Sequence, residues 1–286
     1  MRDRRLDSLI ALIVVLTVLA ASEVCLGWAN DGFSPHRDFQ SNAQPGLNLD
    51  YFKGYLSHTK AIITSPRSWS QSSWLTFSAL AAITAVVASE EDDIQQWIQA
   101  NRTPTTDRIA RTVKPLGNVK VTFSAMAALY AYGEIFEDDH AKVTALMALE
   151  SAVITGGFTE SIKRIAQKHR PGPANLDDAR WDGPSLKRGN LSFPSGHAAH
   201  SFAVATVFAS QYRNVRIVPP LAYAAATLCA LSRLNDNKHW LSDVILGGAL
   251  GHFTAKAVLG LHGAGESRLS LRPSSSGFGL ALSYRF

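Results

Sequence analysis

Hydrophobic residues recur at helical spacing along most of the chain, from about residue 73 to about residue 260. Apolar positions fall three or four residues apart, and no alternating strand pattern appears before residue 265. The pattern predicts an all-α fold, a packed bundle of helices. The expected helices cover residues 73–89, 92–101, 105–114, 118–136, 139–169, 196–212, 215–233 and 240–260.

The two ends of the chain depart from this helical pattern. The basic "MRDRR" followed by the apolar "LIALIVVLTVLAA" predicts a signal peptide, or alternatively an N-terminal anchor, within residues 1–29. Residues 30–72 are rich in Gly, Pro, Ser and Asn, and predict a surface arm with one short helix. Residues 263–286 show two period-2 runs around a Ser-Gly turn, which predict a short β-hairpin packed on the bundle. Residues 73–262 then form the bundle itself.

Membrane insertion is the main open point of this pattern. The apolar stretches run only about 14 to 18 residues, near or below the length that spans a bilayer. Lys120, Glu150, His252 and Lys256 interrupt them, and the mean hydropathy is only +0.01. Charges inside spans are costly. We therefore expect an exported protein of the periplasm or cell envelope, soluble or peripherally associated rather than integral in the membrane.

Composition and charge exclude several other classes of protein. Hydrophobic residues make up 46% and charged residues 18% of the chain, which argues against disorder. The net charge of +5 is not gathered into a basic stripe with aromatic residues, so nucleic-acid binding is not expected. Cys25 and Cys229 are the only cysteines, and they do not support a disulfide framework. The acidic "EDDH" at residues 137–140 reads as a solvated loop, so no metal or cofactor is predicted.

The stretch "LSFPSGHAAHSF" at residues 191–202 contains the first candidate functional residues. Ser195 is a favoured residue at a helix start, and Gly196 and His197 follow it directly. The first turn of a helix has free N–H groups and a positive dipole, so it attracts anions rather than a cationic imidazole. A histidine in this place is best explained by an anion between it and the helix end, with phosphate the usual candidate.

A second segment, "KRIAQKHRP" at residues 163–171, supplies cations. Lys163 and Arg170 are seven residues apart, so on a continuous helix they point the same way. Pro171 is expected to end that helix. Two such cations could bind the oxygens of one anion.

A third segment, "SRLNDNKHWLSD" at residues 232–243, supplies Arg233, His239 and Asp243. His239 and Asp243 are four residues apart on an expected helix, near enough for the carboxylate to hydrogen-bond the imidazole. Such a bond leaves the other ring nitrogen free to act as a nucleophile or base. Three cations, a helix start and two histidines together fit phosphoryl transfer without a metal ion.

These three segments resemble the signature of the type-2 phosphatidic acid phosphatase and vanadium haloperoxidase superfamily. The matching patterns are K-x(6)-R-P, P-S-G-H and S-R-x(5)-H-x(3)-D, in that order within residues 163–243. The resemblance implies the helical bundle of that family around the site. It also implies that phosphate is held by Lys163, Arg170, Arg233, Ser195 and Gly196, that His239 forms a phosphohistidine while Asp243 orients it, and that His197 protonates the leaving oxygen.

The expected function is that of a metal-independent phosphatase acting on phosphomonoesters, with lipid phosphates or pyrophosphates as the expected substrates. One alternative is a vanadate-dependent haloperoxidase, because vanadate mimics phosphate; bromide oxidation would reveal it. A soluble broad-specificity acid phosphatase is a second alternative, although Gly172 stands where soluble members often carry an aromatic residue. A non-enzymatic envelope module is a third. The oligomeric state is not indicated.

Five polar or aromatic residues near these segments receive structural interpretations. Lys168 and His169 are expected to face away from the phosphate on the helix. His200 is expected to be structural, and Trp240 to pack the wall of the pocket. Glu150 is expected to pair with a basic residue.

Overall fold

The computed structural model of the protein describes residues 49–172, 181–186 and 191–264, together with two short segments, 270–273 and 280–283. These residues are mainly helical, which confirms the predicted all-α fold class. The predicted signal peptide or anchor and the first part of the predicted arm lie outside them. The helices are α2 (Leu49–Thr64), α3 (Gln71–Ser89), α4 (Glu91–Ala100), α5 (Pro104–Val113), α6 (Val119–Ile135), α7 (Asp139–Ala166), α8 (Gly196–Gln211), α9 (Val218–Asn235) and α10 (Leu241–Ala264), with 3₁₀ turns η1 (Ser65–Ser68) and η2 (Lys114–Gly117).

Capping residues set the start of α8 and the end of α7. Ser195 is the N-cap of α8, and its side chain accepts a hydrogen bond from the backbone N–H of Ala198. Gln167 follows α7 with a φ of 47°, in the left-handed region that commonly ends a helix. Helix α7 therefore ends at Ala166, before the predicted end at residue 169.

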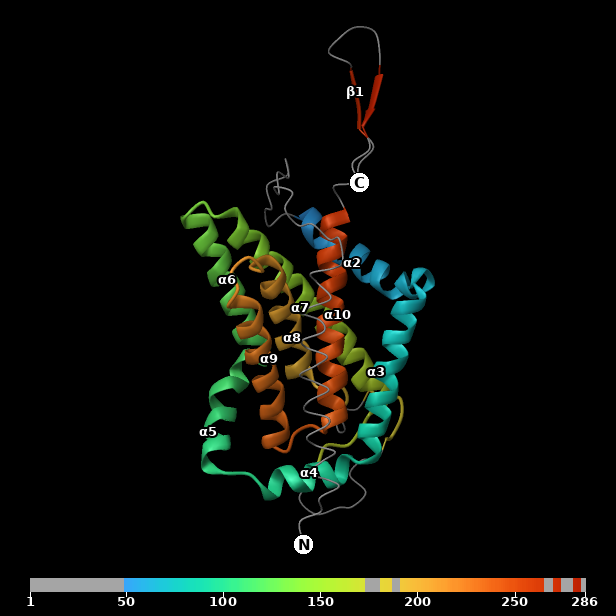
Figure 1. The fold of residues 1–286 in the computed structure, drawn as a ribbon, viewed down its shortest axis with the longest axis vertical. Helices are drawn as coiled ribbons and strands as arrows, with labels where there is room; N and C mark the ends of the chain where they lie inside the picture. The colour runs from blue at the N-terminus through green and yellow to red at the C-terminus, as the bar shows by residue number, and fades with distance from the viewer. Residues whose placement is uncertain (1–48, 173–180, 187–190, 265–269, 274–279, 284–286) are drawn as a thin grey trace.

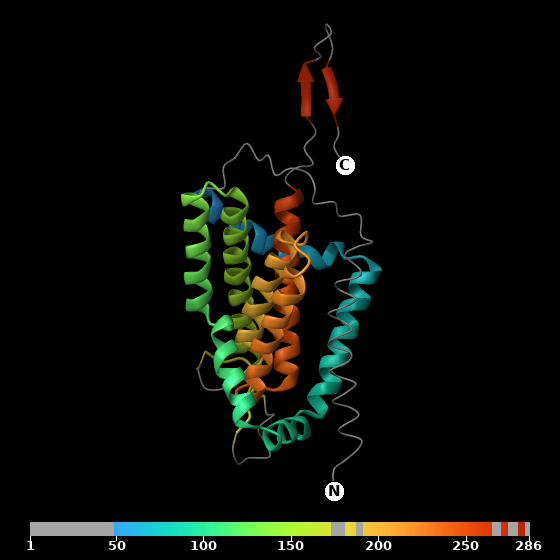
Figure 2. The same ribbon diagram turned by 60° about the vertical axis from the view of Figure 1, so that its left-hand side comes forward.

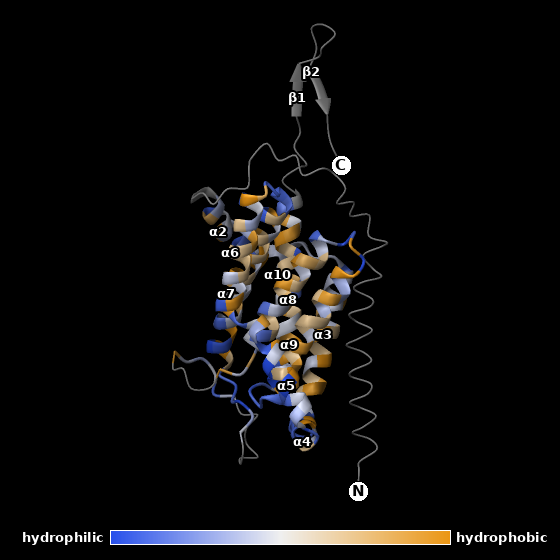
Figure 3. Ribbon diagram, turned by 90° about the vertical axis from the view of Figure 1, so that its left-hand side faces the viewer, coloured by the Kyte–Doolittle hydropathy of each residue, from blue (hydrophilic) through white to orange (hydrophobic). Residues whose placement is uncertain are grey.

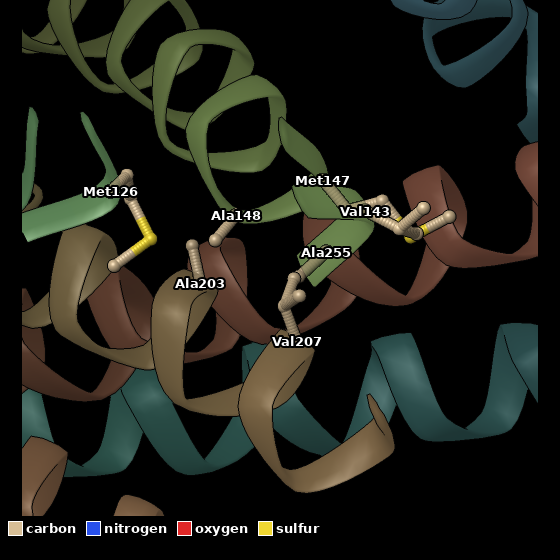
Figure 4. Close-up of a cluster of buried hydrophobic side chains, with 7 residues drawn as sticks. All are labelled: Met126, Val143, Met147, Ala148, Ala203, Val207 and Ala255. Carbon is tan, nitrogen blue, oxygen red and sulfur yellow. The ribbon is translucent and has the colours of Figure 1, made fainter. Parts of the chain in front are cut away.

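Helix α8 is the central helix of the bundle. It packs against α7, α9 and α10, and these helices run side by side in Figure 1. A cluster of buried hydrophobic side chains joins α6, α7, α8 and α10, and several of its members are alanines, which let the helices approach closely. The cluster, drawn in Figure 4, consists of Met126, Val143, Met147, Ala148, Ala203, Val207 and Ala255.

Two glycines bring the backbones of α8 and α10 into direct contact. A Cβ at Gly247 would come 2.5 Å from the carbonyl oxygen of Ser195. A Cβ at Gly251 would come only 2.0 Å from the carbonyl oxygen of Ala199. No real side chain fits at such distances, so this close approach requires glycine at both positions.

Helices α3 and α4 lie outside this central group. Helix α3 runs along α10, and α4 crosses the end of the bundle at which α10 begins (Figure 2). The side chain of Gln95 in α4 donates a hydrogen bond of 3.1 Å to the carbonyl oxygen of Leu234 in α9. Helix α4 is thus fixed against the end of the bundle.

At the C-terminus, β1 (Ser270–Pro273) and β2 (Leu280–Ser283) pair in antiparallel fashion. Residues 274–279 between them lie outside the described residues. The predicted β-hairpin is therefore not confirmed, and its packing on the bundle stays a prediction.

Within the part of the chain that the structure describes, three helices are long and apolar enough to cross a membrane: α3, α7 and α10. Only 11% of the apolar window of α3 is buried inside the molecule, and hydrophobic residues predominate along the long helices in Figure 3. Apolar helices with outward-facing side chains need lipid around them. The prediction of an exported, soluble or peripheral protein is therefore wrong, and these helices point to an integral membrane protein. Exposed side chains on α3 include Trp74, Leu75, Phe77, Ile83 and Val86.

Two of the polar residues that argued against membrane spans have partners inside the bundle. Glu150 is fully buried, and its carboxylate contacts the rings of His58 and His262. The Nδ1 atom of His252 lies 3.0 Å from the hydroxyl of Thr206. Polar groups are tolerated in a span when they face protein partners rather than lipid. The sequence could not reveal these partners because they are distant along the chain.

The contact between α8 and α10 gives a direct test of the packing. Gly251→Ala forces a methyl group into the backbone of α8 and should destabilise the purified protein by about 1–3 kcal/mol, as overpacking does. Gly260→Ala is the matched control in the same helix, because nothing lies within 4 Å of its added Cβ. It should leave stability unchanged or raise it by up to about 1 kcal/mol. Thermal unfolding in detergent measures both, and equal midpoints for the two variants would contradict the packing.

Candidate active site

The three predicted segments meet at the end of the bundle where α8 and α10 begin and where α7 and α9 end (Figure 1). Two backbone hydrogen bonds fix the chain leading into α8. The N–H of Ser192 donates to the carbonyl oxygen of Lys168 at 3.0 Å, and the N–H of Ser195 donates to that of Asp243 at 2.9 Å. The start of α8 is therefore tied both to the residues after α7 and to the first turn of α10.

His239 lies in the connection just before α10, and its ring is buried. Its Nδ1 is 2.8 Å from the carbonyl oxygen of Ser192. Because a carbonyl only accepts, Nδ1 carries the proton and Nε2 keeps its lone pair. The predicted helical pair is corrected: His239 precedes the helix, and its Nδ1 lies 3.6 Å from the Asp243 carboxylate, beyond hydrogen-bond distance.

Asp243 organises the turn that carries His239. Its Oδ2 accepts hydrogen bonds from the hydroxyl of Ser192 and, at 2.9 Å, from the backbone N–H of Trp240. The second bond satisfies a free N–H at the start of α10, in the manner of a capping box. Ser192 links Asp243 to His239. Its hydroxyl donates a hydrogen bond to the Asp243 carboxylate, and its carbonyl oxygen accepts one from Nδ1 of His239. Asp243 therefore positions the histidine through Ser192 as well as through its charge.

Lys168 holds the other oxygen of this carboxylate. Its side chain is completely buried, and its ammonium donates to Glu91 at 2.7 Å, Ser242 at 2.9 Å and Asp243 at 3.1 Å. An ammonium has three N–H donors, so all of them are used. The interpretation of Lys168 as a helical residue facing away from the site is corrected. It lies beyond α7 and is a positioning residue for Asp243.

Glu91 brings α4 into the same network. It stands in the first turn of α4, is buried, and accepts a 2.6 Å hydrogen bond from the hydroxyl of Ser242 in addition to that from Lys168. Burial raises the pKa of Glu91, and the charge of Lys168 opposes that rise. The two carboxylates of Glu91 and Asp243 thus share one buried ammonium.

Aromatic side chains enclose the Lys168 ammonium. Trp240 is buried, as predicted for a wall residue, and its indole N–H donates to the carbonyl oxygen of His169 at 2.8 Å. The faces of such rings attract a cation and exclude water from its ion pairs. The ring centroids lie 5.2 to 5.8 Å from the nitrogen and belong to Trp181, Phe193 and Trp240.

Two of the three predicted phosphate-binding cations are buried. Lys163, near the end of α7, donates to the carbonyl oxygen of Leu191 at 2.8 Å. Arg233, near the end of α9, donates through Nη1 to Asp236 at 2.9 Å, while its buried Nε has no hydrogen-bond partner among the described residues. A buried donor of this kind is expected to have an acceptor, and an anion oxygen would supply one.

Arg170 is exposed and lies beyond the end of α7. The prediction that Lys163 and Arg170 lie on one face of a continuous helix is therefore wrong. The left-handed Gln167 ends the helix first, and the residue before Pro171 is in any case disfavoured in the α conformation. The charges of Lys163 and Arg170 nevertheless both act on His239, so the two cations lie near the same ring without sharing a helix face.

The first turn of α8 faces this group of cations. Gly196 is the first residue of the helix and His197 the second, so their backbone N–H groups have no acceptor within the helix. The ring of His197 is half-buried, and among the described residues none hydrogen-bonds to it. A helix start with free N–H groups is a ready anion-binding site.

Both histidines are neutral at pH 7 in the unliganded protein. Burial, helped by the positive charges of Lys163 and Arg170, lowers the pKa of His239 to about 4. Burial, helped by the charge of Arg233, likewise lowers the pKa of His197 to about 4. A neutral His239 with a free Nε2 is a competent nucleophile, and an anion bound beside His197 would favour its protonated form.

Sequence reasoning missed three residues of this arrangement: Lys168, Ser192 and Glu91. Lys168 and Ser192 stand inside or beside the predicted segments, so only their roles were missed. Glu91 is 77 residues away from Lys168 along the chain, and no local pattern points to it.

The Lys168 network predicts a large loss of stability when the ammonium is removed. Lys168→Met leaves two buried carboxylates without their counter-charge and should destabilise the protein by about 3–5 kcal/mol. Arg164→Met is the control, because its ion pair with Glu160 is partly exposed and should be worth at most about 1 kcal/mol. The added change Glu91→Gln should recover part of the loss. If the two single variants had equal unfolding midpoints, Lys168 would not hold the network together.

The low pKa of His239 predicts a loss of stability in acid. The unfolded chain binds a proton near pH 6.5 and the folded chain only near pH 4, so stability is intact above pH 6.5 and falls as the pH drops towards 4. His239→Asn removes this contribution of His239 to the pH dependence of stability. From pH 7 to pH 4.5 the wild type should lose about 2–3 kcal/mol more than the variant in thermal unfolding. Parallel losses would show that His239 is not a buried neutral imidazole.

Parts of the chain are similar to known proteins. Residues 144–265 match the family model described as PAP2 superfamily. A 61-residue stretch is 43% identical to a lipid A 1-phosphatase of Porphyromonas gingivalis, which amounts to 21% of this chain and 14% of that protein.

Two solved structures also resemble the chain. A transmembrane PAP2 type phosphatidylglycerolphosphate phosphatase from Bacillus subtilis aligns over 77% of this chain and 96% of its own, with 18% identity and a TM-score of 0.47. LpxE from Aquifex aeolicus aligns over 59% of this chain and 94% of its own, with 20% identity and a TM-score of 0.43.

Proposed function

Because residues 144–265 of this chain match the PAP2 superfamily model, we propose that it is a membrane phosphatase that hydrolyses the phosphate of a lipid through a phosphohistidine intermediate. One observation carries the proposal. The buried His239 donates its Nδ1 proton to a carbonyl, which leaves Nε2 free on a ring that the charges of Lys163 and Arg170 act upon. A neutral nucleophile within an anion-binding site is what attack on phosphorus requires.

In the proposed first step, the Nε2 lone pair of His239 attacks phosphorus while the bond to the leaving oxygen breaks. Lys163, Arg170 and Arg233, together with the N–H groups of the first turn of α8, neutralise the charge on the phosphoryl oxygens. His197 gives its proton to the leaving oxygen, which departs as an alcohol.

In the second step, water hydrolyses the phosphohistidine. His197, now neutral, removes a proton from the attacking water, the N–P bond breaks, and inorganic phosphate leaves. Asp243 stabilises the positive imidazole that forms during both steps, held in place by Lys168 and Ser192. The cationic side chains take the role that metal ions have in other phosphoryl-transfer sites, so the reaction needs no metal in this site.

The membrane helices support a lipid as the substrate. The three candidate spans leave apolar side chains facing outward, so a lipid could reach the end of the bundle from within the bilayer. The protein of which a 61-residue stretch is 43% identical to this chain acts, by its name, on lipid A. Phosphate release from lipid A 1-phosphate, phosphatidylglycerophosphate and phosphatidic acid in mixed micelles tests this, against glucose 6-phosphate as a soluble control. Faster release from glucose 6-phosphate than from every lipid would contradict a lipid phosphatase.

The two histidines should respond differently to substitution. His239→Ala should abolish turnover of every substrate, because no phosphoenzyme can form. His197→Ala should slow cleavage of an alkyl phosphate by about 10²–10⁴-fold, since an alcohol needs protonation to leave. An aryl phosphate releases an acidic phenol, so its first step should survive better in the same variant.

The expected record for His197→Ala with an aryl phosphate is a burst of phenol followed by a slow steady state, with labelled phosphate retained on the protein. His140→Ala is the control, because this exposed histidine contacts the carbonyl oxygen of Gln211 and the ring of Tyr212, far from the site. Equal losses for aryl and alkyl substrates in both site variants, with no retained phosphate, would show that the roles are wrongly assigned.

A further inference from the structure

A second group of ionisable side chains lies away from the proposed active site. The carboxylate of Glu150 in α7 is fully buried and contacts two histidines through different oxygens. The Nδ1 of His58 in α2 lies 2.6 Å from Oε1, and the Nε2 of His262 near the end of α10 lies 2.7 Å from Oε2. The three potential ligand atoms all lie within 4.8 Å of one another. The hydroxyl of Tyr51 is 3.3 Å from Oε2 and adds a fourth polar group.

This group is separate from the phosphate site. Glu150 precedes Lys163 by 13 positions on α7, which corresponds to about 20 Å at the rise of an α-helix. His262 follows Asp243 by 19 positions on α10, or about 28 Å. The group therefore lies towards the opposite end of the bundle, where α2 crosses α10 in Figure 1.

We propose that Glu150, His58 and His262 bind a divalent transition-metal ion, with zinc as the best match. Two imidazole nitrogens and one carboxylate oxygen are common zinc ligands, and the phenol of Tyr51 or water could complete a four-coordinate shell. The ion would replace the protons now shared between the rings and the carboxylate. A shift of less than about 1 Å by the two rings makes room for an ion about 2.0–2.2 Å from each ligand atom.

The burial of Glu150 supports a bound cation. It stands within a candidate membrane span, where an ionisable side chain is rarely retained without a function. A carboxylate there needs a positive partner, and a metal ion supplies that charge at pH values where free histidines are mostly neutral. The side chains of His58 and His262 remain 24% and 20% exposed, which gives an ion a route to the site.

The proposed role of the ion is structural. Helix α2 contacts the bundle through α7 and α10, and the three ligands come one from each of these helices. The ion would therefore fasten α2 across the end of the membrane bundle. It would take no part in the phosphate chemistry, so this proposal stands or falls separately from the proposed function.

The test measures zinc bound to the full-length protein, purified in detergent with a tag that contains no histidine run. The protein is stripped with a chelator, given one equivalent of zinc, desalted and analysed by mass spectrometry of the metal. Wild type and the control His140→Ala should retain about one zinc per chain, as expected for a structural site. His58→Ala and His262→Ala should retain at least about ten-fold less, the effect of losing a ligand.

A second measurement covers variants that fold poorly. Zinc should raise the unfolding midpoint of the wild type but not that of His58→Ala, whose partly exposed ring lies on α2 and can be removed without disturbing the packing of α7 to α10. Cobalt should give a visible absorption band in the wild type that His262→Ala lacks. The proposal is overturned if the wild type retains less than about a tenth of an equivalent of zinc, or if both ligand variants retain as much as His140→Ala.

Discussion

The buried ammonium of Lys168 is the interaction on which the site depends. It neutralises Glu91 and Asp243 together, in a space closed by aromatic rings and inaccessible to water. Without it, two carboxylates would be buried next to each other, and their repulsion and desolvation would oppose the packing of α4 against α10. Asp243 accepts a hydrogen bond from Ser192, and the carbonyl oxygen of Ser192 accepts one from His239. The position of the histidine therefore depends on the ion pair between Lys168 and Asp243.

Close helix packing and the membrane environment act together in this fold. Glycines on α10 let its backbone touch α8, which brings the starts of both helices to the same end of the bundle. The apolar side chains of α3 face outward, so lipid rather than a second protein layer can surround them. Among the described residues, buried carboxylates are paired in two clusters, one around Lys168 and one around Glu150.

Much of this could be predicted from the sequence, because the information is local. Helical spacing of apolar residues predicted the all-α class, and the run of Ser195, Gly196 and His197 predicted a helix start, which the structure has at Ser195. The anion expected at this helix start stays a prediction. The conformation around Arg170 could not be predicted, since a single left-handed residue, Gln167, ends the helix early. Pairings between residues that are distant along the chain could not be predicted from the sequence either. The membrane prediction failed in part for this reason, because the two histidines that partner Glu150 lie 92 and 112 residues away along the chain.

The central claim is that His239 attacks phosphorus through Nε2 within a site formed by cationic side chains. An experimental structure of the full-length protein with bound vanadate tests it most directly, because vanadate adopts the geometry of a phosphoryl group under attack. The account predicts vanadium bonded to Nε2 of His239, with its oxygens in hydrogen-bond contact with Lys163, Arg233 and the first turn of α8. Vanadate bound elsewhere, or held in this site without a bond to His239, would contradict the account.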